Sequence, residues 1–120
     1  MKSDKELLVF VLEQINILET FYQNKDEEAF LRDPVLKDAC LMKLLVIGEY
    51  ASKISNEQKR RFSEIEWELL KASRNYYAHV YGSVTWPRVW ETLDKNIPEL
   101  KRKIEHIIEV LENEYNGKTN

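Results

Sequence analysis

Apolar residues recur at steps of three and four along most of the chain, the spacing that places side chains on one face of an α-helix. The first series predicts a helix from Asp4 to about Tyr22, with Ser3 or Asp4 as its N-cap. After a polar stretch, one short turn of helix is expected over Ala29–Arg32. This pattern already favours helices joined by short connections.

A second long helix is expected to start at Pro34, because Asp33 supplies a capping carboxylate and proline suits the first helical position. It should end near Ser55. Only Lys43 is charged between Ala39 and Ile47, so this helix must be covered on more than one side, by two neighbouring helices or by another protomer. It is the expected core element.

Serine followed three residues later by Gln or Glu is the signature of a capping box, and it occurs twice after this helix. Ser55 with Gln58 predicts a short helical segment. Ser63 with Glu66 predicts a third helix that runs to about residue 77 or 78.

In the last part of the chain, Thr85 can cap a helix whose first turn holds Trp86 and Pro87, and helical spacing continues to Gly117. Pro98 should bend or divide that helix. The expected fold is all-α: an antiparallel four-helix bundle with short extra helical segments, in one domain spanning residues 1–120.

Composition supports this fold class. Gly and Pro together make up only 6 of the 120 residues, too few turn residues for an all-β fold. The longest apolar run, Leu7–Leu12, is far shorter than the ~18 residues that span a bilayer, so no membrane segment is expected. The first ten residues, MKSDKELLVF, carry acids and no small-residue cleavage site, which predicts no secretory signal and a cytoplasmic protein.

Neither a metal nor a nucleotide cofactor is expected. No Cys/His spacing suggests a zinc site, and the three glycines lie 34 and 35 positions apart, so they form no phosphate-binding loop. The single cysteine, Cys40, has apolar neighbours and is expected to be a buried thiol rather than a nucleophile.

The charge pattern contains one feature that bundle packing does not explain. Twenty-two residues, Leu69–Trp90, contain no carboxylate, and residues 51–90 carry a net charge of +3 within a chain of net charge -3. Such a window can bind a polyanion while the acidic remainder keeps the protein soluble. Its candidate RNA-binding residues are Lys71, Tyr77 and Arg88.

Within this window lies RNYYAHVY, which begins at Arg74 and contains His79. If the third helix reaches His79, the two side chains lie on neighbouring parts of its surface, where both could face one phosphate. A histidine can take a proton from a ribose 2'-hydroxyl or give one to a leaving 5'-oxygen, and a guanidinium can hold the phosphate between them. These groups suffice for RNA cleavage without a metal. The tyrosines beside them could stack on unpaired bases.

On spacing alone, a structural interpretation is favoured. Arg74 would then be a solvated helix-terminal cation, His79 a C-terminal cap, and the tyrosines ordinary core and boundary residues. His106 is expected to be structural or exposed. The basic run 59–61 is expected to be a solvated face, although it could extend a phosphate track. The three tryptophans, Trp67, Trp86 and Trp90, are expected to be core or dimer-interface residues.

The residues resemble those of the HepT-like toxins of the HEPN superfamily, small helical ribonucleases encoded beside a minimal nucleotidyltransferase antitoxin. The R-x4-H-x-Y pattern formed by Arg74, His79 and Tyr81 is the most specific feature of the resemblance. The segments IGEYASKIS, starting at Ile47, and NIPEL, starting at Asn96, add to it. Val80 departs from the glycine that is frequent there, and GSVT, starting at Gly82, lacks an aspartate that often follows the motif.

The resemblance implies a homodimer in which the motifs of two protomers line a shared cleft, with Arg74 and His79 catalytic and Asn75 supporting them. It further implies the toxin of a HEPN/MNT (type VII) toxin–antitoxin pair, whose nucleotidyltransferase partner silences it by transferring AMP to Tyr81. Bulk and negative charge at that tyrosine would oppose an RNA backbone. The alternative hypothesis is a non-catalytic substrate-binding or adaptor subunit of a nucleotidyltransferase.

Overall fold

The computed structural model describes residues 2–79 and 81–119, with side chains over 2–74 and 82–117. Every regular element in these ranges is helical, which confirms the predicted all-α class. In chain order the elements are α1 (Asp4–Tyr22), α2 (Glu27–Arg32), α3 (Pro34–Ala51), α4 (Asn56–Arg61), α5 (Trp67–His79), the 3-10 turn η1 (Tyr81–Ser83), α6 (Trp86–Glu91), the π-helical turn η2 (Thr92–Asn96) and α7 (Ile97–Thr119).

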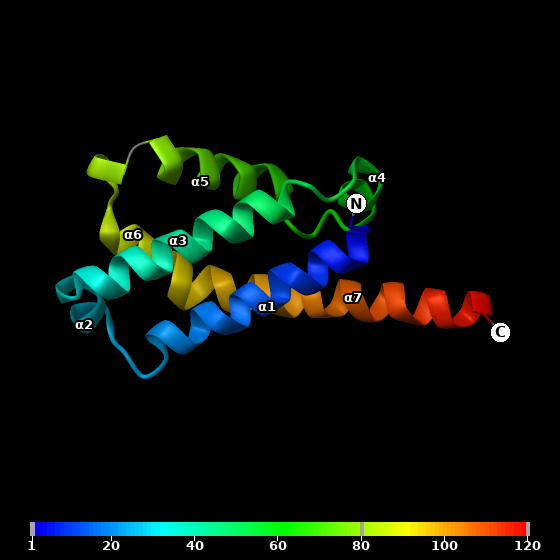
Figure 1. Ribbon diagram of the computed structural model, residues 1–120, viewed down its shortest axis with the longest axis horizontal. Coiled ribbons are helices and arrows are strands. Elements are labelled where there is room, and N and C mark those ends of the chain that lie inside the picture. The colour runs from blue at the N-terminus through cyan, green and yellow to red at the C-terminus, as the bar shows by residue number, and fades with distance from the viewer. Residues whose placement is uncertain (1, 80, 120) are drawn as a thin grey trace.

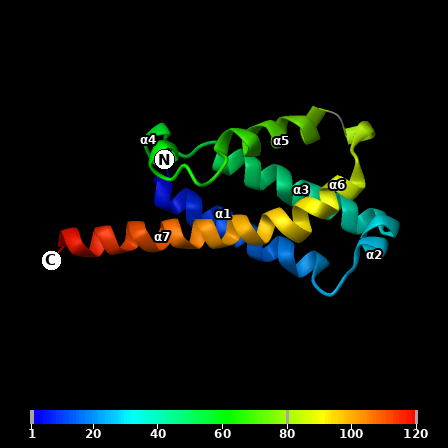
Figure 2. The same ribbon diagram turned by 180° about the vertical axis from the view of Figure 1, so that it is seen from behind.

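The long helices α1, α3, α5 and α7 run along the longest dimension of the molecule, which measures 54 × 29 × 24 Å (Figure 1). Helices that follow each other in this set are antiparallel, as predicted. The view from behind shows α7 extending past the end of α1, so its last turns project beyond the bundle (Figure 2).

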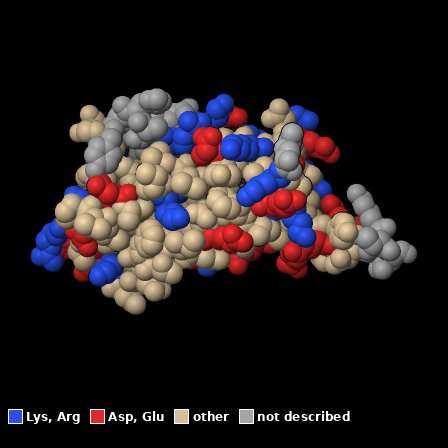
Figure 3. Space-filling model, viewed as in Figure 1, with Lys and Arg blue, Asp and Glu red and all other residues tan. Residues whose placement is uncertain are grey.

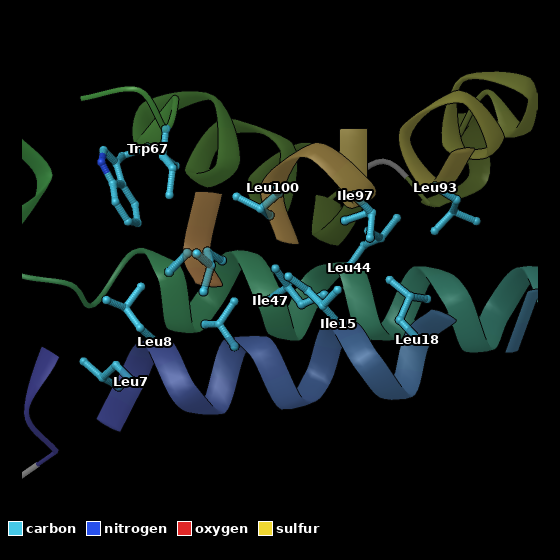
Figure 4. Close-up of a cluster of buried hydrophobic side chains, with 14 of the residues drawn as sticks. Leu7, Leu8, Ile15, Leu18, Leu44, Ile47, Trp67, Leu93, Ile97 and Leu100 are labelled. Carbon is cyan, nitrogen blue, oxygen red and sulfur yellow. The ribbon is translucent and has the colours of Figure 1, made fainter. Parts of the chain in front are cut away.

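Helix α3 is the central element. It packs against α1 on one side and against α5 on the other, so the prediction that two neighbouring helices cover it is confirmed. Figure 4 shows Ile47 and Leu44 on α3 facing Ile15 on α1, with Leu100 on α7 closing the same core. The outer side of α3 still exposes apolar side chains: Val35 is 78% and Met42 is 59% exposed.

Two predicted helix starts are confirmed by their hydrogen bonds. The Asp33 carboxylate accepts from the backbone N–H groups of Val35 and Leu36 at 3.1 and 3.0 Å, directly before Pro34. Ser3, rather than Asp4, caps α1. The Asp4 carboxylate accepts instead from the backbone N–H and the hydroxyl of Ser55, at 2.9 and 2.6 Å, which ties the start of α1 to the start of α4.

The second helix was predicted to end near Ser55, and this boundary is wrong, because α3 ends at Ala51. Ser55 is the N-cap of α4 and has an extended backbone, with φ -62° and ψ 152°, which a continuing helix cannot adopt. Its hydroxyl accepts from the Gln58 N–H, but Asp4 takes the Ser55 N–H that the Gln58 side chain would accept from in a complete capping box.

The start of the third helix is also shifted, from the predicted Ser63 to Trp67. The indole N–H of Trp67 donates to the Phe62 carbonyl at 3.1 Å, and the ring is buried. The intervening residues form tight turns around this ring instead of a first helical turn, with the Ile65 N–H bonded to the same carbonyl.

The last helical region begins after Thr85 as predicted, with Pro87 in the first turn of α6. It is divided at η2, just before Pro98, which is the second residue of α7. Proline lacks an N–H and its ring clashes with the carbonyl four residues earlier, here that of Asp94 in η2. The wider π turn accommodates both effects.

Phe30 holds the short helices α2 and α6 together at one end of the bundle. It is fully buried, and its ring centroid lies 5.4 Å from that of Trp90 and 6.3 Å from that of Trp86. These two tryptophans are therefore packing residues, as expected. None of the helices in the described part of the chain is both long enough and apolar enough to cross a membrane.

Candidate functional site

Helix α5 carries the R-x4-H motif, and α3 holds its arginine. The Arg74 side chain is 29% exposed, and its Nε lies 3.3 Å from Oε2 of Glu49 on α3. Nε itself is buried, and among the described residues it has no aligned hydrogen-bond acceptor. The Glu49 carboxylate is therefore the group that balances the charge at this edge of the guanidinium.

His79 is the last residue of α5, five residues after Arg74 and roughly 7.5 Å further along the helix axis. The predicted extension of this helix to about residue 78 is thus confirmed. The side chains of Asn75, Tyr77, His79 and Tyr81 lie outside the part of the structure that is described. Their proposed roles stay predictions.

The backbones of α3 and α5 approach closely beside Arg74, at Gly48. A Cβ atom on Gly48 would lie 2.8 Å from the Arg74 Cβ and 3.2 Å from the Leu70 carbonyl oxygen. Real Cβ atoms essentially never come as close as 2.8 Å to another carbon. The base of the Arg74 side chain therefore rests on the one residue of α3 that has no side chain.

The basic residues of the window are divided between two sides of α5. Lys71 is exposed and lies three residues before Arg74, on the same side of the helix. Arg88 is exposed on α6 and lines a hollow of about 310 Å³ between α5 and the η2–α7 region, together with Ser73 and Asn96. Lys71 therefore lies on the same side of α5 as Arg74, whereas Arg88 lines the hollow.

The window lacks acids in sequence but not in space. Glu49 contacts Arg74, while Glu66 and Glu99 border the hollow. The Lys103 ammonium, 2.9 Å from the Glu99 carboxylate, lowers the pKa of that carboxyl. Figure 3 shows basic and acidic side chains interspersed along the upper edge of the molecule, where Figure 1 places α5.

Sequence reasoning did not assign a role to Gly48 or Glu49, because they precede Arg74 by about 25 residues and approach it only when α3 packs on α5. A signal was present nevertheless. Glycine inside a long apolar helix disfavours that helix, so its presence indicates a close backbone approach. It lies in the segment IGEYASKIS, which already contributes to the family resemblance.

The other singled-out residues have structural environments. Arg61 is ion-paired with Glu114 on α7, and the Lys59 ammonium donates to the Ser52 carbonyl at 3.0 Å. These two residues of the basic run 59–61 thus make structural contacts at the surface. His106 is exposed on α7. Cys40 is fully buried, and burial raises the pKa of its thiol to about 12, so it stays protonated at neutral pH.

No three His, Cys, Asp or Glu side chains within 2–74 and 82–117 gather closely enough to hold a metal ion. The clearest chemical feature in those ranges is the anchored guanidinium. Its planar group of five N–H donors suits a phosphate, and the contact with Glu49 is made at Nε.

A helical fold whose α5 ends at the histidine of an R-x4-H motif is what the resemblance to small helical ribonucleases implies. The family model described as "Ribonuclease HepT-like" matches residues 11–107, a range that includes α5 and the whole motif. The chain therefore belongs to the HepT-like ribonuclease family.

Relatives at about 30% identity agree with this assignment. The chain is 29% identical over 109 residues to "Putative RNase TTE0752" of Caldanaerobacter subterraneus subsp. tengcongensis, covering 91% of this chain and 97% of that one. It is 33% identical over 106 residues to "Probable ribonuclease HepT" of Thermococcus cleftensis, covering 88% and 96%. It is 32% identical over 108 residues to "Putative RNase MJ1216" of Methanocaldococcus jannaschii, covering 90% and 89%. No solved structure matches the chain significantly.

Proposed function

We propose that this protein is a metal-independent endoribonuclease in which Arg74 and His79 act on one phosphate of an RNA strand. The observation that carries the proposal is the anchoring of Arg74 on α3, five residues before His79, in a chain that belongs to a ribonuclease family. If Arg74 were only a solvated cation at the helix end, neither the close approach to Gly48 nor the contact with the Glu49 carboxylate would be required.

The proposed reaction is attack of a ribose 2'-oxygen on the adjacent phosphorus. The new O2'–P bond forms while the P–O5' bond breaks, leaving a 2',3'-cyclic phosphate and a free 5'-hydroxyl. His79 accepts the proton of the attacking hydroxyl or donates one to the leaving oxygen, and Arg74 stabilises the crowded anionic phosphate. Asn75 supports the pair. In a homodimer with both motifs at one cleft, the two His79 side chains divide these proton transfers.

In the same proposal the protein is the toxin of a toxin–antitoxin pair, and a minimal nucleotidyltransferase is its antitoxin. The Tyr81 oxygen attacks the α-phosphorus of ATP and loses its proton, pyrophosphate leaves, and an AMP group remains on the tyrosine. The modification adds negative charge two residues from His79, which repels an RNA phosphate.

The decisive experiment is cleavage of total RNA by the purified protein in EDTA, beside the His79→Ala variant at equal concentration. His106→Ala is the matched control, because His106 is exposed on α7. We expect discrete fragments from the wild type and the control and none from His79→Ala. Cleavage that survives in His79→Ala contradicts the proposed mechanism, and absence of cleavage in all three favours the alternative of a non-catalytic subunit of a nucleotidyltransferase.

The modification has its own test. Incubation with the partner transferase and ATP should add one or more AMP groups, detected by intact mass, and the Tyr81→Phe variant should show no addition. Tyr115→Phe serves as the matched control, because Tyr115 is 65% exposed on α7. A mass increment that persists in Tyr81→Phe and disappears in Tyr115→Phe would place the AMP group on Tyr115 and contradict the proposal for Tyr81.

A further inference from the structure

We propose that Gly48 and Glu49 of α3 form a seat that positions the Arg74 guanidinium for the phosphate, with Glu49 as a positioning residue for the proposed cleavage. This inference rests on the proposed ribonuclease function for its kinetic consequence. The seat itself is a matter of geometry, and it can be measured without RNA.

Gly48 contributes to the seat by leaving space for the base of the Arg74 side chain. The Arg74 Cβ and Cγ would lie 2.8 and 3.3 Å from a Cβ at position 48, so any other residue there would have to push α5 away. Gly82 and Gly117 differ, because nothing lies within 4 Å of a Cβ built on either of them. Gly48 is the fifteenth residue of the 18-residue helix α3, and glycine within a helix is unfavourable for that helix, so the close approach to Arg74 is the feature that requires it.

Glu49 contributes to the seat through the negative charge of its carboxylate beside the Arg74 guanidinium. An arginine side chain has several rotatable bonds, and a guanidinium anchored only at Cβ would sample many orientations. The Glu49 carboxylate at 3.3 Å from Nε restricts that edge of the planar group. The edge formed by the two terminal nitrogens is the one that a phosphate can engage with two parallel hydrogen bonds.

The energetics favour positioning over stabilisation of the fold. Glu49 is 45% exposed and Arg74 29% exposed, and ion pairs with that much access to water contribute little to folding stability. A carboxylate beside a phosphate site also opposes the binding of RNA. The presence of Glu49 is therefore explained by its positioning of Arg74. Removal of the Glu49 charge should lower kcat through the loss of positioning, and should lower KM or leave it unchanged through the loss of repulsion.

The kinetic test compares Glu49→Gln with the wild type on the same RNA. We expect kcat to fall by about tenfold while KM is unchanged or lower, since a misoriented guanidinium loses transition-state stabilisation and the repulsion of RNA is relieved. In the Arg74→Lys background, which lacks Nε, the same change should have no further effect on kcat. Glu19→Gln is the matched control, because it removes the 2.7 Å pair between Glu19 on α1 and Lys101 on α7 and should leave kcat unchanged.

The second test follows the Nε–Hε resonance of Arg74 by NMR, assigned by its loss in Arg74→Lys. Because Nε is buried, its proton should exchange slowly with water in the wild type, and Glu49→Gln should shift the signal and speed its exchange. An unchanged signal overturns the seat whatever the cleavage result. A shifted signal with unchanged kcat in a protein that cleaves RNA overturns the positioning role, as does a lower KM as the sole kinetic effect. If no RNA is cleaved, the proposed function fails while the resonance still decides the seat.

Discussion

The ammonium group of Lys43 on α3 donates a 2.6 Å hydrogen bond to the side-chain carbonyl of Gln14 on α1. Gln14 is 8% exposed and is the buried polar side chain in an otherwise apolar described core, while Lys43 is half-buried. The pair therefore gives the one charged residue in the middle of α3 a hydrogen-bond partner on α1 and satisfies the buried Gln14 carbonyl.

The pair should behave as a unit in a double-mutant cycle of unfolding free energy. Lys43→Met leaves the buried Gln14 carbonyl without its donor and should cost about 1–3 kcal/mol. Adding Gln14→Leu removes the orphaned amide and should restore most of that loss. Denaturant unfolding of the four proteins measures both effects. Simple addition of the two single changes would mean that the hydrogen bond contributes nothing specific.

Most of the fold could be predicted from local signals. Asp33 with Pro34 marks the start of α3 by chemistry that needs no tertiary contact, and the run with Lys43 as its only charge correctly indicates cover on two sides. The errors fall where a distant group intervenes. Asp4 engages the Ser55 N–H and changes the end of α3, and Trp67 folds the preceding turn around its own ring.

The candidate site was predictable only in part, for the same reason. Arg74 stands out through its motif, whereas Glu49 becomes relevant only when α3 packs on α5. An acid-free window along the chain does not imply an acid-free neighbourhood, because helix packing brings side chains from other segments to it. The predicted basic residues Lys71 and Arg88 likewise prove to flank different sides of α5.

Gly48→Ala should destabilise the protein, although alanine is the better helix former by about 1 kcal/mol. The added methyl group must displace Arg74 or the Leu70 carbonyl, and overpacking of this kind costs typically ~1–3 kcal/mol. Thermal or denaturant unfolding measures the loss. Gly117→Ala in α7 is the control and should be neutral or slightly stabilising, because its new Cβ meets no other atom. Equal gains in both variants would show that α3 and α5 separate without cost.

Cys40 should be unreactive in the folded protein. Its thiol is fully buried with a pKa raised to about 12, so a disulfide reagent at pH 8 should react at the rate of unfolding, and at once in denaturant. Fast stoichiometric reaction of the native protein would contradict the burial of this side chain.

The same raised pKa makes stability depend on alkaline pH. The folded pKa of about 12 lies above the usual value of 9.0, so the unfolded chain loses the proton first, and this contribution to stability is complete below pH 9 and disappears between pH 9 and 12. In Cys40→Ala the decline of unfolding free energy over that range should be shallower, by up to about 1.4 kcal/mol per pH unit. Burial also raises the pKa of Tyr22, with smaller contributions from neighbouring groups that include Cys40. The comparison of the two proteins therefore cancels only the part of the Tyr22 shift that does not depend on Cys40.

RNA should follow α5, and the salt dependence of binding can locate it. In the His79→Ala background, which keeps the RNA intact, Lys71→Gln and Arg88→Gln should each weaken binding and reduce the slope of log K against log salt by about 0.7, the value for one phosphate contact on a single strand. Lys25→Gln, in the connection between α1 and α2, is the control and should change neither quantity. A loss at Lys71 alone would place the strand on the Glu49 side of α5, whereas a loss at Arg88 alone would place it along the hollow that Ser73 and Asn96 line. Losses at both require a strand that crosses α5 at its C-terminal end, where the motif lies, and equal losses in all three variants would contradict a defined path.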